Sequence, residues 1–248
     1  MKREKIMEND NVYSYSIIEY KGNKYFKKEL NLVDDEHIQM LNNELHKWNL
    51  LKKYSFIPKV CFFDNEKQHY IMYEYIEGEN LHDYKFNSLQ EKIDVLAAIA
   101  NSMYVIHQLF LVHGDLKPTN IMITPNKDIY ILDFACSKYI GEEISYGTKR
   151  YCSIEQLNKE KARTDFDIYA LGIIMYELLT NKKAYFGMND KEIINLKKSN
   201  SSLVIDDDDS IPLEVERIFF KIVNNKYANM NEIEKELLSC NFLDYNKN

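Results

Sequence analysis

The 248-residue sequence has no apolar run long enough to cross a membrane, although 45% of its residues are hydrophobic. It also has no basic stripe, and its net charge of −7 argues against a nucleic-acid partner. Its four cysteines are scattered without metal-ligand spacing, so they predict reduced thiols rather than a zinc site or a disulfide framework. These absences predict a cytoplasmic globular protein that binds neither nucleic acid nor membrane.

Glycine and proline are scarce, at seven and four residues, and there is no Ser/Gly-rich linker or internal repeat. Nothing in the composition therefore divides the chain into separately linked domains. The length is enough to bury a sizeable core, as one large domain or as two lobes. A charged fraction of 29% beside the apolar content also excludes wholesale disorder.

Residues 113–120 place a carboxylate, an ammonium and a carboxamide on one tight loop with the sequence HGDLKPTN. Two apolar runs follow, at 121–123 and 129–132, and the turn residues between them predict a β-hairpin that leads to Asp133. In phosphoryl transfer one carboxylate orients a hydroxyl, one cation meets the γ-phosphate, and an amide and a second carboxylate hold magnesium. The side chains of these types are Asp115, Lys117, Asn120 and Asp133.

This pattern resembles the eukaryotic-type Ser/Thr protein kinase family, whose catalytic loop reads H-R-D-L-K-P-x-N and whose metal motif reads D-F-G. The sequence departs from it with Gly114 in place of the Arg and Ala135 in place of the last Gly. The resemblance implies ATP and Mg²⁺ or Mn²⁺ as cofactors, with Asn120 and Asp133 as metal ligands. The residues with implied catalytic roles are Asp115, Lys117 and Asn120, and those with implied structural roles are His113 and Phe134.

The resemblance extends to the N-terminal third, where residues 24–30 are predicted to form the second strand of a β-hairpin. In the family this strand carries a lysine that binds the nucleotide phosphates, and here Lys27 and Lys28 compete for the role. Strand alternation puts Lys28 on one face with Phe26 and Leu30, whereas Lys27 shares its face with a tyrosine and a glutamate. The more apolar set favours an inward-facing Lys28. Two solvated lysines on an edge strand remain the alternative.

A helix is predicted from about residue 35 to residue 53, because its apolar residues recur at three- and four-residue steps. Glu44 lies on this apolar face, where a carboxylate needs a partner. The family's helix supplies a glutamate that pairs with the strand lysine, so the resemblance gives this role to Glu44. The alternative is that Glu44 lies at the edge of the apolar stripe and reaches water.

Residues 74–78 resemble the hinge of the family, in which backbone groups bind adenine. The implied contacts are the carbonyl of Glu74 and the N–H of Ile76. Two departures lower the expected affinity for ATP. No G-x-G-x-x-G sequence precedes the lysine strand, so the backbone cradle for the phosphates is absent or built from other residues. Phe26 also stands where the family usually has an alanine beside adenine.

The C-terminal part is predicted to be helical, beginning with one long buried helix over residues 88–112. Residues 165–180 resemble the family's central helix, D-x-Y-S-L-G, whose aspartate, here Asp167, would accept hydrogen bonds from the backbone of the catalytic loop. Residues between these helices resemble the end of the activation segment, G-T-x-x-Y-x-x-P-E, with Thr148 retained and Glu155 as the final glutamate.

In the family this glutamate pairs with an arginine near the end of the domain. The matching stretch here offers Lys226, which lacks the bidentate fork and predicts a weaker pair. A simply exposed Lys226 is the alternative. Gly114, in turn, cannot grip a phosphate on the activation segment as the family's Arg does. Activity is therefore expected not to require phosphorylation of Ser145, Tyr146 or Thr148.

The expected fold is α+β and bilobal, with a small β-rich N-lobe containing one main helix over residues 1–76 and a larger, mostly α-helical C-lobe over residues 77–248. The favoured function is ATP- and Mg²⁺-dependent transfer of the γ-phosphate to Ser/Thr hydroxyls of a protein substrate. A pseudokinase that acts as a scaffold remains open, as does the need for an activating partner protein.

A third function also remains open, namely small-molecule phosphotransfer of the aminoglycoside or choline kinase type. That class favours H-G-D over H-R-D, which matches Gly114. It does not share Lys117, Thr148, Glu155 or the helix that carries Asp167, and these features favour a protein acceptor.

Overall fold

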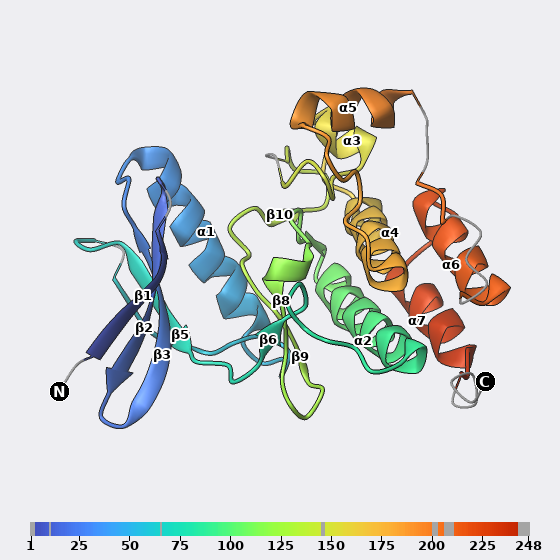
Figure 1. The fold of residues 1–248 in the computed structure, drawn as a ribbon. Helices are drawn as coiled ribbons and strands as arrows, with labels where there is room; N and C mark the ends of the chain where they lie inside the picture. Colours follow the sequence, from blue (N-terminus) through green and yellow to red (C-terminus); the bar gives the residue numbers. More distant parts are fainter. Residues whose placement is uncertain are drawn as a thin grey trace. The chain divides into compact units, whose positions relative to one another are not determined.

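The computed structural model describes residues 3–9, 11–64, 66–144, 147–199, 203–205 and 211–242, so Ser145 and Tyr146 lie outside the described residues. The chain divides into two compact units (Figure 1). The first contains Met1–Glu79 and Met122–Ala135, and the second contains Asn80–Ile121 and Cys136–Asn248. The chain thus returns to the first unit after leaving it, whereas the predicted lobes divide the chain only once.

The first unit is built on a five-stranded antiparallel sheet, with the helix α1 (Asp35–Leu51) beside it in Figure 1. Its strand order is β1-β2-β3-β5-β4. In that order, the strands span Arg3–Asn9, Tyr13–Tyr20, Asn23–Leu30, Tyr70–Glu74 and Val60–Asp64. The strand β1 is not among the predicted elements, because its two apolar residues, Ile6 and Met7, are adjacent and show no alternation.

The strands β2 and β3 are joined by a two-residue turn in which Lys21 and Gly22 both have positive φ, at 51° and 80°. Such type I′ turns match the twist of the flanking strands. The turn fixes the register, so Tyr15 lies opposite Lys28 and both face the same side of the sheet. This is the side on which the polar site described below is assembled.

The helix α1 begins after Asp34, whose carboxylate accepts the backbone N–H of His37 at 2.9 Å. It buries Leu41 and Glu44. One apolar core cluster of the unit contains Tyr13, Leu30, Leu41 and Ile71, which come from β2, β3, α1 and β5. The helix ends at Leu51, two residues before its predicted end.

The predicted β-hairpin after the polar loop is present, as β8 and β9 in a three-stranded sheet of order β6-β8-β9. The bounds of these strands are Glu79–Asn80, Ile121–Ile123 and Ile129–Ile131. The backbone N–H of Ile131 donates to the carbonyl of Phe56 at 2.9 Å. This bond holds the end of β9 within the first unit, just before Asp133.

The second unit is mostly helical, so the α+β class is confirmed. In Figure 1, α2, α4, α6 and α7 lie side by side, and α3 lies against α5. The helices α2 to α7 span Leu89–Gln108, Ile154–Leu157, Thr164–Thr180, Asp190–Lys198, Leu213–Val223 and Met230–Ser239. Within the described part of the chain, none of the helices combines the length and apolar character needed to cross a membrane.

The helix α2 is shorter than the predicted helix over residues 88–112. It ends at Gln108, and Phe110 adopts a left-handed backbone conformation with φ of 58°. Leu111 and Val112 then form the short strand β7, which pairs with β10 (Lys138–Tyr139). Because both β7 residues are fully buried, the apolar pattern continues past the true end of the helix.

The helices α4 and α6 approach each other closely at Gly172. A Cβ atom there would lie 2.7 Å from Cγ2 of Ile222 and 3.0 Å from Cγ1 of Val223. Overpacking in Gly172→Ala should cost about 1–3 kcal/mol, and the better helix propensity of alanine offsets about 1 kcal/mol of this. We therefore expect the free energy of unfolding to fall by up to about 2 kcal/mol. Urea denaturation measures the difference.

The matched control introduces Gly172→Ala into an Ile222→Ala background, where the nearest clashing methyl group is gone. There the glycine substitution should be neutral or stabilising. Increased stability of Gly172→Ala in the otherwise unchanged chain would show that the two helices separate at little cost.

Candidate active site

The first unit contains a buried charged network around Lys28 of β3. The Nζ atom of Lys28 lies 2.8 Å from Oε2 of Glu44 and 2.9 Å from Oδ1 of Asp133. The ring of Tyr13 also covers it, with the ring centroid 4.5 Å from Nζ. The side chains of Lys28 and Glu44 are only 4% and 3% exposed. The structure therefore brings three predicted site residues together and shields two of them from solvent.

Electrostatics keeps the ammonium of Lys28 charged. Burial by itself would lower the pKa of Lys28, but the carboxylates of Asp133 and Glu44 outweigh burial and hold this pKa well above its ordinary value. The neighbouring Lys27 serves the other face of the sheet, where its Nζ lies 2.5 Å from Oε2 of Glu29. The two adjacent lysines are thus separated by their contacts, and Lys28 is the one that contacts Glu44.

Tyr73 of β5 completes this network, and sequence patterns did not identify it. Its hydroxyl donates to Oε1 of Glu44, so both carboxylate oxygens of Glu44 are bonded. Burial, followed by the charge of Glu44, raises the pKa of Tyr73 well above its ordinary value. The available signal was strand register, because Tyr73 lies opposite Phe26 and therefore faces the Lys28 side. The ring of Phe26 stacks on Tyr15, with centroids 5.8 Å apart.

The segment after β9 is held by α1. Asp133 has a left-handed backbone with φ of 61°, and the amide of Asn43 donates to the carbonyl of Ala135 at 3.0 Å. Phe134 between them is buried. The predicted hinge residue Glu74 is the last residue of β5, and its carboxylate accepts the backbone N–H of Lys59 at 3.0 Å. Ile76 lies half-buried in the segment between β5 and β6.

In the second unit, the polar loop gathers the other predicted residues around Asp115. Nζ of Lys117 lies 2.6 Å from Oδ2 of Asp115 and 2.9 Å from the hydroxyl of Thr148. The backbone N–H of Thr148 donates to Oδ1 of Asp115 at 2.6 Å. The amide nitrogen of Asn120 donates to the carbonyl of Asp115 at 2.9 Å. The loop and the later segment at Thr148 therefore position one carboxylate from both sides.

Asp167 of α4 holds this loop through hydrogen bonds to its backbone. Its carboxylate accepts the backbone N–H groups of His113 and Gly114 at 2.8 and 3.0 Å. It also lies 2.9 Å from Nε2 of His107. Burial would raise the pKa of Asp167, but the hydrogen bonds from His107 and Gly114 reverse this and lower it. The loop backbone is thus bonded to a carboxylate that stays ionised.

The backbone at Gly114 is unfavourable for an arginine side chain. Gly114 has φ of 77°, and a Cβ atom would lie 3.1 Å from the carbonyl oxygen of Cys136. An L-residue side chain would therefore be strained in conformation and crowded in space. The carbonyl of Gly114 is bonded as well, because the amide of Gln156 donates to it at 2.7 Å.

The predicted ion pair between Glu155 and Lys226 is not formed among the residues that the structure describes. Asn225 adopts a left-handed backbone with φ of 52° as the chain leaves α6, and Lys226 that follows it is exposed. The amide of Asn225 instead lies 3.4 Å from Asp165. Glu155, Asp165 and Asn225 line a cavity of about 310 Å³ that Lys226 does not reach.

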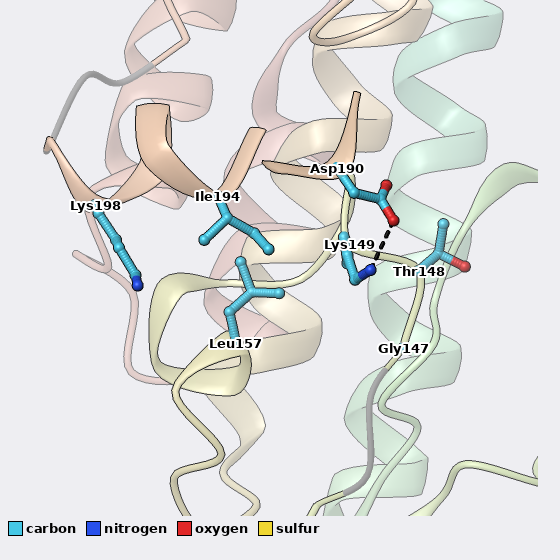
Figure 2. Close-up of a pocket in the computed structure, with 7 residues that line it drawn as sticks. All are labelled: Gly147, Thr148, Lys149, Leu157, Asp190, Ile194 and Lys198. Carbon is cyan, nitrogen blue, oxygen red and sulfur yellow. Dashed lines mark hydrogen bonds and ion pairs between the residues drawn. The ribbon is translucent and has the colours of Figure 1, made fainter. Parts of the chain in front are cut away.

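A larger cavity of about 750 Å³ opens beside Thr148 (Figure 2). The residues that line it are Gly147, Thr148, Lys149, Leu157, Asp190, Ile194 and Lys198. Figure 2 shows Leu157 and Ile194 pointing toward each other, while Lys149 and Asp190 form an ion pair of 2.6 Å. The cavity therefore combines an apolar surface with a charged edge, next to the residue that contacts Asp115.

The protein kinase domain family matches residues 12–241 of the sequence. The chain belongs to this family. The match covers nearly all of both units, including the Lys28 network and the Asp115 loop.

Several bacterial serine/threonine-protein kinases are similar to the chain. The probable serine/threonine-protein kinase PknB of Lactococcus lactis is 28% identical over 195 residues, which are 72% of this chain and 31% of that protein. PknB of Mycobacterium leprae is 30% identical over 129 residues, 48% of this chain and 21% of that protein. The chain thus spans about a third or less of the length of these relatives.

The charge on Asp167 gives a pH-dependent prediction. We expect Asp167→Asn to lower the free energy of unfolding at pH 7 by roughly 3–5 kcal/mol, because it breaks a buried charged network. The pKa of Asp167 lies below the ordinary 3.8 in the folded chain, so its stabilisation is complete above that value and is lost as the pH falls through the folded pKa. The difference between the two proteins, measured by urea denaturation, should therefore shrink below pH 3.8.

Asp165→Asn in the same helix is the control. Its partner Arg163 is 46% exposed, so the loss should stay within about 1 kcal/mol. A constant difference between Asp167→Asn and the unsubstituted chain at every pH would contradict an ionised Asp167.

Proposed function

We propose that this protein kinase transfers the γ-phosphate of ATP to Ser or Thr hydroxyls of a protein substrate. The observation that carries the proposal is the fixed carboxylate of Asp115, with the ammonium of Lys117 2.6 Å away. In phosphoryl transfer such a carboxylate orients the attacking hydroxyl and accepts its proton. The adjacent ammonium offsets the negative charge of the transferred phosphoryl group.

Lys28 is proposed to bind the nucleotide phosphates, with Glu44 holding its ammonium in place. The backbone groups at Glu74 and Ile76 are proposed to contact adenine. These roles rest on the resemblance of the motifs and on the buried Lys28–Glu44 pair of 2.8 Å. A lysine that stays charged when buried can meet phosphate oxygens without first gaining a proton.

Asn120 and Asp133 are proposed to hold Mg²⁺ or Mn²⁺. The donor set suits these ions, since carboxylate and amide oxygens are the hard ligands that they select. The amide nitrogen of Asn120 donates to the carbonyl of Asp115, so the metal ligand would be the amide oxygen. When bound, the ion would neutralise charge on the phosphate oxygens.

A protein rather than a small-molecule acceptor is supported by Thr148, which contacts both Asp115 and Lys117. The cavity of Figure 2 lies beside this contact and offers space for an acceptor chain. The similar proteins are named serine/threonine-protein kinases, which agrees with a hydroxyl of Ser or Thr as acceptor. An activating partner protein stays a proposal on the resemblance alone.

One observation favours a pseudokinase as the second candidate. Aromatic rings crowd the Lys28 face of the sheet, where Tyr13 covers Nζ and Tyr15 stacks on Phe26. In the family an alanine usually stands at the position of Phe26. If these rings do not move, they would compete with a nucleotide for the same face.

Loss of the Asp115 carboxylate should separate the two candidates. We expect Asp115→Ala to lower autophosphorylation with labelled ATP and Mg²⁺ by about 10²–10⁴-fold, because the general base is removed. Asp94→Ala, at an exposed position of α2, is the control and should keep full activity. Equal incorporation by Asp115→Ala and the unsubstituted chain would contradict the assigned base. No incorporation by any of the three proteins would favour the pseudokinase.

Metal binding can be tested without turnover. We expect Asp133→Asn to abolish the Mg²⁺-dependent part of ATP binding measured by calorimetry, since it removes a hard carboxylate ligand. Glu44→Gln is the matched control, because it also breaks an ion pair of Lys28 but removes no proposed metal ligand. That variant should bind ATP more weakly with and without Mg²⁺. An Asp133→Asn variant that binds Mg–ATP as tightly as the unsubstituted chain shows that the metal site is misassigned.

A further inference from the structure

Lys197 of α5 has a buried amino group that contacts the segment after Thr148. Only 6% of the residue is exposed. Its Nζ lies 3.0 Å from the carbonyl oxygen of Lys149, 2.8 Å from that of Arg150 and 2.5 Å from that of Cys152. An ammonium has three N–H donors, so these three carbonyls use all of them.

The surroundings of Lys197 disfavour the charged form of its amine. The rings of Tyr169 and Tyr185 flank Nζ, each with its centroid 5.0 Å away. Burial lowers the pKa of Lys197 to about 7, although Cys152 opposes the shift. No carboxylate pairs with the ammonium among the described residues. The three carbonyl contacts, rather than an ion pair, are therefore the interactions that Lys197 contributes here.

The segment that Lys197 holds is the one that meets Asp115. Thr148, just before it, donates its backbone N–H to Asp115 and accepts from Lys117. At the start of this stretch Thr148 and Lys149 line the cavity in Figure 2, and α5 lines it through Asp190, Ile194 and Lys198. Lys197 therefore links α5 to residues 149–152 through buried hydrogen bonds. The Lys149–Asp190 ion pair links the same two segments at the surface.

We propose that Lys197 is a positioning residue for the acceptor protein: by binding the carbonyls of residues 149–152 it holds Thr148 and Lys149, which line the cavity, in place beside Asp115. The inference rests on the proposed function, because it assumes that an acceptor chain binds beside Thr148. It adds a residue far from the catalytic loop in sequence, on which acceptor binding but not nucleotide binding depends. Removing the ammonium should loosen residues 148–152 and leave the Lys28 network unchanged.

The first test measures the mobility of residues 148–152 without any ligand. Lys197→Met keeps the aliphatic stem and removes the three donors, and Lys191→Met, at an exposed position of the same helix, is the control. Hydrogen–deuterium exchange should become at least tenfold faster at the backbone amides of Thr148, Tyr151 and Cys152, and only in Lys197→Met. Unchanged exchange at these amides overturns the proposal.

The second test measures acceptor binding. The probe is one Ser-containing peptide, chosen from a degenerate library as the best acceptor of the unsubstituted chain. In Lys197→Met the KM for this peptide should rise about tenfold, while the KM for ATP stays within twofold. Faster exchange with an unchanged peptide KM overturns the role in acceptor binding. The unsubstituted chain could instead phosphorylate no library peptide while exchange is still faster in Lys197→Met. That result would support the role of Lys197 in holding residues 148–152 and would count against the proposed function.

The unsubstituted chain provides a measurement that does not depend on the folding of a variant. A neutral amine has two N–H donors for three carbonyls, so exchange at the same amides, corrected for its intrinsic pH dependence, should rise between pH 6 and pH 8.5. The other groups that face Nζ should not titrate in this range. Burial raises the pKa of the Cys152 thiol to about 11 and raises those of Tyr169 and Tyr185, and Arg150 is a guanidinium. A flat corrected profile, together with unchanged exchange in Lys197→Met, overturns the proposal.

Discussion

The carboxylate of Asp167 binds two backbone N–H groups of the loop that carries Asp115 and the ring of His107, all inside the second unit. A buried carboxylate without donors is costly, and so is a buried N–H group without an acceptor. The loop and α4 therefore constrain each other. The position of Asp115 follows from this contact, and the position of Thr148 follows from Asp115. The residues proposed to meet the acceptor hydroxyl thus depend, through these hydrogen bonds, on the charge of Asp167.

The first unit meets a different electrostatic requirement, because two carboxylates share one ammonium. Lys28 contacts Glu44 from α1 and Asp133 from the segment after β9, and Tyr73 from β5 bonds the second oxygen of Glu44. Four elements are thereby coupled around Lys28 and Glu44, whose side chains are shielded from water. A displacement of α1 would move Glu44 and leave Lys28 with Asp133 alone, so the orientation of the lysine depends on the seating of the helix.

Much of both sites could be predicted because the information lies within single segments. The polar residues at 113–120 share one loop, and alternation along β3 separates Lys28 from Lys27. Contacts between distant segments could not be found in this way. Lys197 reaches carbonyls 45 to 48 residues earlier, and Lys226 is turned into solvent by a left-handed residue before it. Such contacts depend on helix packing and chain turns, which the periodicity of one element does not contain.

Gly114 limits which substitutions the loop that carries Asp115 can accept. Its left-handed backbone and a Cβ position only 3.1 Å from the carbonyl oxygen of Cys136 make any side chain there strained and crowded. A single substitution to arginine would therefore strain the loop that carries Asp115 before the new side chain could bind any phosphate. An arginine that could bind a phosphate from this position would therefore require a small shift of the backbone near Cys136.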